Sequence, residues 1–120
     1  MEDIVHSFLE FQIAFKIYHW QTASYSRHKA SDALFGSLSE KIDRFVECLQ
    51  GSRDRKIKFR TDRAIELKNY SDKDAVLLLR EFEAWLNKNL SKSIREKDLL
   101  NIRDEILADV HQALYLFTLE

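Results

Sequence analysis

Proline is absent from the 120-residue chain, and glycine occurs only twice, at Gly36 and Gly51. Both residue types interrupt helices and mark turns, so their scarcity argues against a turn-rich β fold and favours long helices. The single cysteine, Cys48, excludes an internal disulfide and suits a reducing compartment.

The chain also lacks a strong charge of either sign and a long apolar run. Nineteen Lys and Arg residues nearly balance twenty Asp and Glu residues, so the overall charge does not predict a nucleic-acid partner. No apolar run approaches the roughly 20 residues of a membrane span, and no basic-then-apolar leader opens the chain. We therefore expect a single cytoplasmic domain over residues 1–120 that makes no membrane contact.

Apolar residues recur at helical spacing in four segments, which predicts an all-α four-helix bundle. The expected helices are Glu2–Gln21, Tyr25–Gly51, Asp72–Leu90 and Ile94–Leu119. A short turn at Thr22–Ser24 is expected to join the first helix to the second, and one at Ser91–Ser93 to join the third to the fourth. A long connector, residues 52–70, forms a crossover that lets the second and third helices run parallel, and residues 62–69 are expected to add one or two helical turns. Gly51 is the expected C-cap of the second helix.

Four potential metal ligands share one face of the second helix, within about 100° around its axis. They are His28, Asp32, Asp43 and Glu47. The first and second pairs are about 22 Å apart along the axis, so one copy of the helix cannot gather all four. Two antiparallel copies can, because the midpoints of 28/47 and of 32/43 both fall between residues 37 and 38. A two-fold axis at that point places His28 and Asp32 of one chain opposite Asp43 and Glu47 of the other. The same axis creates two equivalent sites.

Small residues Gly36 and Ser39 lie beside the predicted axis and would let the two helix backbones approach closely. His19, at the end of the first helix, is brought near His28 and Asp32 by the intervening turn. Three ligands from one chain and two from the partner make a nitrogen and oxygen set that suits iron, manganese or zinc. The alternatives are a solvated polar face and a boundary histidine stacked on aromatic residues.

His19-Trp20, followed by His28-x3-Asp32-x10-Asp43-x3-Glu47, resembles the ferroxidase signature of the Dps family, the ferritin-like DNA-binding proteins from starved cells. The resemblance spans roughly residues 15–51. It implies a ferritin-like bundle in which His19, His28 and Asp32 of one subunit and Asp43 and Glu47 of its mate bind iron. It also implies oxidation of Fe(II), typically by peroxide, and iron storage. Trp20 would then be an electron donor, with plain packing as the alternative.

The chain departs from the Dps pattern in several respects. The stretch from His19 to His28 is a few residues shorter, there is no lysine-rich tail, and the chain is short for a closed twelve-subunit shell. The Glu-x-x-His motif of classical ferritins is also absent, since Ala108 precedes His111 by three residues. The chain further resembles small ferritin-like proteins of large DNA viruses and phages, which would place it in the host cytoplasm. The rival interpretation is a structural or interaction protein, such as a viral accessory component, without chemistry.

Basic residues gather between positions 53 and 63, and a solvated loop is favoured there over a nucleic-acid contact. We expect no strong nucleic-acid binding. His111 is expected to be a satisfied core or surface histidine. The sequence contains no P-loop, dinucleotide fingerprint or zinc-knuckle spacing.

Overall fold

The computed structural model describes residues 1–119, and this part of the chain is helical with no strand. The helices are α1 (Glu2–Gln21), α2 (Tyr25–Arg53), α3 (Asp72–Ala84), the π-helical segment η1 (Trp85–Leu90), α4 (Ser91–Ser93) and α5 (Lys97–Leu116). Because α3, η1 and α4 follow one another without a break, residues 1–119 form four helical rods. The all-α, four-helix prediction is confirmed.

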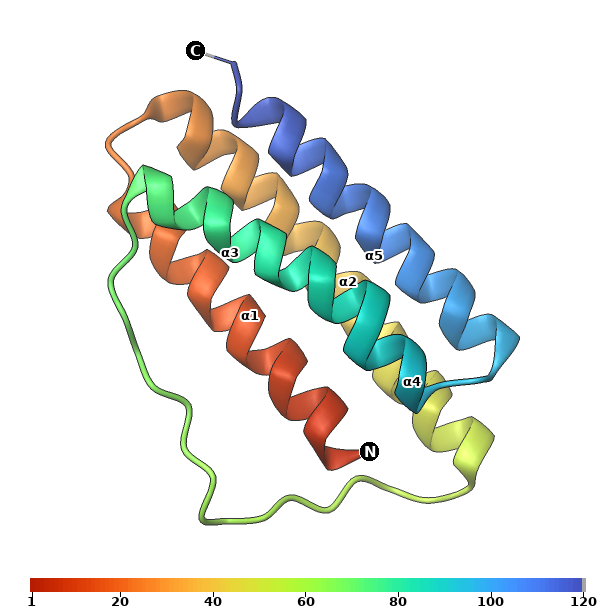
Figure 1. Ribbon diagram of the computed structural model, residues 1–120. Coiled ribbons are helices and arrows are strands. Elements are labelled where there is room, and N and C mark those ends of the chain that lie inside the picture. Colours follow the sequence, from red (N-terminus) through yellow and green to blue (C-terminus); the bar gives the residue numbers. More distant parts are fainter. Residues whose placement is uncertain (120) are drawn as a thin grey trace.

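The rods lie side by side with short turns at two of the three connections (Figure 1). The α1–α2 turn is followed by Ser24, whose hydroxyl caps α2 by accepting from the Arg27 amide at 3.3 Å. Residues 54–71 run back along the outside of the bundle, so α3 starts at the end where α2 starts. α2 and α3 therefore point in the same direction, and α5 returns antiparallel to both.

Apolar stripes from the four rods meet in one core. The stripe of α2 is fully buried, as its spacing predicts; it consists of Leu34, Leu38, Ile42, Phe45 and Leu49. Phe8 of α1 contacts Phe45 edge-on, with ring centroids 5.1 Å apart. This burial uses one side of α2 and leaves the face that carries Asp32, Asp43 and Glu47 outside the core.

Arg27, on α2, forms hydrogen bonds that link the four helical rods at one end of the bundle. Its guanidinium donates to the Tyr18 hydroxyl at 3.2 Å, to the Asp72 carbonyl at 2.8 Å and to the Phe117 carbonyl at 3.2 Å. The Tyr18 hydroxyl in turn donates to the Asp72 carboxylate at 2.7 Å. This is the end that carries His19 and His28, so the network fixes the backbone around the two histidines.

Several predicted boundaries are wrong. α2 continues past Gly51 to Arg53, and its C-cap is Asp54, which adopts the left-handed conformation with φ 50°. Aspartate tolerates that conformation better than most residues, so no glycine is required there. Residues 62–69 form no helix. Ser91–Ser93 continues the third helical rod, and the turn that leads into α5 lies at residues 94–96.

No helix within residues 1–119 combines the length and apolar character needed to span a bilayer.

Candidate metal site

The candidate ligands of α2 lie on a surface free of the chain's own core. Asp32, Asp43 and Glu47 are exposed, and so is His28. His19, on α1, is 7% exposed. The four candidate ligands of α2 are thus all exposed, and the buried His19 lies beside the N-terminal end of that helix.

His19 and His28 stack on each other across the α1–α2 turn. Their ring centroids are 3.9 Å apart and the rings are inclined by only 18°. His19 Nδ1 is 2.9 Å from the carbonyl oxygen of His28, and His28 Nδ1 is 2.9 Å from the carbonyl oxygen of His19. Each imidazole is thus tied to the other residue's backbone.

This reciprocal pairing determines which nitrogen of each ring is protonated. A carbonyl oxygen only accepts hydrogen bonds, so both Nδ1 atoms must donate. In the neutral imidazoles the lone pairs are then on Nε2, the nitrogen through which histidine commonly binds metals. Hydrogen bonds from the other ring nitrogen to a carbonyl are the usual outer-shell support of metal-binding histidines.

Ser31 and Asp32 complete this end of the site. The Ser31 hydroxyl donates to the His28 carbonyl at 3.1 Å and lies 3.2 Å from His19 Nδ1. The Asp32 carboxylate is 3.8 Å from His19 Nε2, which is too long for a hydrogen bond. At the N-terminal end of α2, His19 therefore lies between the stacked His28 ring and the nearby Asp32 carboxylate.

Asp43 and Glu47 form the second pair, one turn apart near the other end of α2. The neighbouring Asp43 carboxyl raises the pKa of Glu47, first through a shared proton and then through charge repulsion. Two carboxylates that repel each other at the surface form a pair whose charge a cation would neutralise.

The structure does not bring the two pairs together within one chain. Their separation along α2 is about 22 Å by helix geometry. Among residues 1–119, no three His, Cys, Asp or Glu side chains are grouped so that they could hold a metal ion. A complete ligand set would therefore require a second copy of the chain.

The surface between the two pairs is open. A Cβ atom placed on Gly36 would have no atom within 4 Å, and Gly36 is exposed. Ser39 accepts a hydrogen bond from the Gln12 side chain at 3.1 Å, which ties α1 to α2 on this side. The middle of this face is thus open at Gly36, whereas α1 partly covers it at Ser39.

Trp20 also lies outside the chain's core. Trp20 is 68% exposed, and the Lys16 ammonium lies 5.7 Å from the centroid of the Trp20 ring. The same ammonium lies 4.6 Å from the Phe35 ring on α2. Packing within the chain's own core therefore does not account for Trp20.

The other sequence features have local partners. His111 Nε2 is 2.7 Å from the Glu83 carboxylate at the surface. In the basic segment, Arg53 pairs with Glu96, and Arg63 pairs with Glu2 and Asp3. Half of the basic side chains between 53 and 63, including Arg60 with Asp62, are thus engaged within the chain.

Sequence reasoning missed Ser31 as part of the histidine network. A serine inside a helix carries no signal of that role, because its contacts depend on how the turn stacks the two imidazoles.

Comparison with known proteins gives one finding. Residues 19–117 match the family described as "Family of unknown function (DUF5856)". The chain belongs to that family. The matched region begins at His19 and includes all five candidate ligands. No curated protein and no solved structure matches the chain.

Proposed function

We propose that two copies of this DUF5856 protein pair through the outer face of α2 and bind metal ions at two equivalent shared sites. Each site takes His19, His28 and Asp32 from one copy and Asp43 and Glu47 from the other. The proposal corresponds to a ferritin-like, Dps-like bundle with its crossover between α2 and α3. Iron is the favoured metal, with manganese or zinc as alternatives.

The reciprocal hydrogen bonds between His19 and His28 carry the proposal. A histidine pair placed for packing alone needs no fixed tautomer, whereas here both Nδ1–H groups are held by carbonyls and both Nε2 lone pairs remain. The open backbone at Gly36 and the repelling pair Asp43 and Glu47 support the partner's contribution.

Fe(II) is the substrate in the proposed reaction, and peroxide is its oxidant. Histidine and carboxylate ligands suit Fe(II) and leave positions for the oxidant. The chain's residues bind and orient the ion. Fe(II) gives one electron and the exposed Trp20, next to His19 in the sequence, gives the second, so one H2O2 and two protons become two water molecules. The alternative is a structural or interaction protein, for which the same face would be a contact surface without metal.

Anaerobic calorimetric titration with Fe(II), repeated with Zn(II), tests the proposal. The native protein should bind one ion per chain, and Asp43→Asn with Glu47→Gln should lose most of that binding. A matched control, Asp104→Asn with Glu105→Gln, removes the same two charges from the exposed face of α5. Equal binding by the two double variants, or none by the native protein, would overturn the proposed site.

A further inference from the structure

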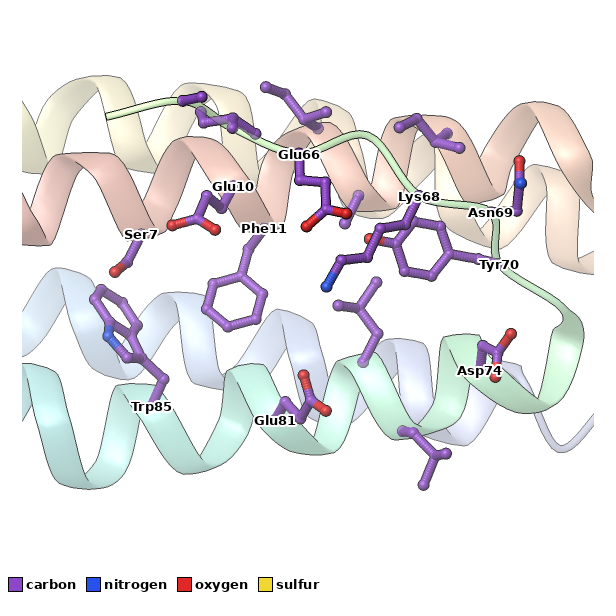
Figure 2. Close-up of a pocket in the computed structure, with 17 residues that line it drawn as sticks. Ser7, Glu10, Phe11, Glu66, Lys68, Asn69, Tyr70, Asp74, Glu81 and Trp85 are labelled. Atoms are coloured by element: carbon purple, nitrogen blue, oxygen red, sulfur yellow. The ribbon is translucent and has the colours of Figure 1, made fainter. Parts of the chain in front are cut away.

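A hollow whose lining includes neither His19 nor His28 lies beside α1. It has a volume of about 670 Å³ and is formed by α1, α3 with the start of η1, and connector residues 64–70. Figure 2 shows side chains from all three segments surrounding it. This volume is within the range of small-molecule sites.

The floor of the pocket is apolar and aromatic. Phe11 and Trp85 lie 5.9 Å apart between ring centroids, and Ala14 and Leu78 add buried aliphatic surface. Trp85 opens η1, and π-helical turns often occur where a helix shapes a functional site. Such a floor favours a ligand with apolar segments.

The rim of the pocket is strongly acidic. Four of its lining residues are carboxylates, Glu10, Glu66, Asp74 and Glu81, and one is a lysine, so the lining has a formal net charge of −3. This contrasts with the chain as a whole, whose net charge is only −1. The local excess therefore decides which charge a ligand must carry.

Tyr70 lines the same pocket as these carboxylates. Burial raises the pKa of its phenol, and the nearby charges of Glu81, Asp74, Glu10 and Glu66 raise it further. Glu10 is partly used by His6, whose Nδ1 lies 2.7 Å from it. Glu66 and Glu81 make no ion pair in residues 1–119 and remain available.

Lys68 is the one cation of the pocket, and it indicates the ligand class. Figure 2 shows its four-carbon stem extending across the hollow, with the ammonium directed between Glu66 and Glu81. No carboxylate of residues 1–119 forms an ion pair with that ammonium. The pocket thus already accommodates an alkylammonium group supplied by the chain itself.

The acidic groups are also spaced along the groove. Asp74 and Glu81 are seven residues apart on one face of α3, about 10.5 Å along the helix axis. An apolar chain with ammonium groups at intervals can place a charge near each end and methylenes over the aromatic floor. Ammonium groups are also attracted to aromatic faces such as that of Trp85.

We infer that this pocket binds a linear aliphatic polyamine, with the ligand's ammonium groups taking the place of the Lys68 ammonium. The inference uses a different face from the metal proposal and does not depend on it.

Calorimetric titration with spermine at physiological ionic strength tests the inference, with MgCl₂ of matched ionic strength as the comparison. The native protein should bind one spermine per chain. Glu66→Gln with Glu81→Gln should weaken binding by at least about tenfold, since each charge-assisted hydrogen bond contributes substantially. Glu105→Gln with Asp104→Asn on α5 removes the same amount of charge and should leave the affinity within about twofold.

The Lys68→Met variant distinguishes binding in this pocket from general attraction of a polycation to an acidic surface. It removes the competing ammonium and keeps the apolar stem, so spermine affinity should rise several-fold. Equal losses in both double variants, equal binding of Mg²⁺ or no effect of Lys68→Met would each overturn the inference. Circular dichroism of every variant confirms that the helices are retained.

Discussion

His19 and His28 hold each other by two hydrogen bonds of the same length, 2.9 Å from each Nδ1 to the other residue's carbonyl oxygen. The stacked rings are thereby fixed in tautomer and orientation before any ligand arrives. Fixed ligands reorganise little on binding, which favours affinity.

Gly36→Leu should disrupt the proposed dimer without damaging the chain. A Cβ atom at this position has open space around it, and leucine favours a helix over glycine by about 0.8 kcal/mol. The monomer should therefore be as stable as the native chain or more so, while the partner helix is pushed away. Sedimentation velocity measures the loss of dimer.

Gly51→Leu is the matched control, because Gly51 lies in the same helix and is equally open. It should keep the native oligomeric state. If both variants sediment like the native protein, the two helices do not cross at Gly36.

Glu47→Gln should stabilise the metal-free protein at neutral pH. The pKa of Glu47 is raised in the folded chain by Asp43, so folding favours the protonated form. The repulsion therefore destabilises the fold as pH rises above 4.5, the ordinary pKa of a glutamate, and it is absent at lower pH, where the carboxyl is protonated. The melting temperature should rise by about 1–2 °C at pH 7, with little gain at pH 4.

Asp43→Asn removes the same repulsion and should give a similar gain. The double variant should gain no more than either single change. Additive gains would show that the two carboxyls do not interact.

Glu96→Gln should destabilise the bundle, because the pKa of Glu96 is lowered in the folded chain, whereas that of Glu47 is raised. The Arg53 guanidinium, 3.1 Å away, and the Arg95 amide lower the pKa of Glu96 to about 2. The stabilisation is present above the ordinary pKa and is lost as pH falls from about 4.5 toward 2. At pH 7 the free energy of unfolding should fall by about 1 kcal/mol, after allowance for solvent screening.

Urea denaturation at pH 7 and pH 3 measures this difference. Asp62→Asn, which breaks the exposed pair with Arg60, should have little effect at either pH. A loss for Glu96→Gln that is the same at both pH values would contradict the ion-pair explanation.

The sequence predicts the fold better than the site. Apolar spacing is a property of each helix, so the buried stripe of α2 follows from the order of its residues. The last turn of α2 is held by contacts of Arg53 with Glu96 and the Ser93 carbonyl, which local preferences do not specify. The face shared by Asp32, Asp43 and Glu47 was predictable from helical geometry. The stacking of His19 on His28 was not, because it depends on the path of the turn.

Subunit mixing tests the central claim that each metal site is shared. Asp32→Asn damages every site from one side, and Asp43→Asn with Glu47→Gln damages every site from the other. Each homodimer should therefore bind Fe(II) or Zn(II) poorly. A heterodimer of the two contains one site with all native ligands and one damaged from both sides.

Equal amounts of the two variants should be mixed, and subunit exchange confirmed by mass spectrometry of differently labelled chains. Random pairing should restore about one quarter of the native metal binding, because half of the dimers are mixed and each has one intact site. Confirmed exchange without recovery of binding, or native binding by either variant alone, would contradict a site built from two chains.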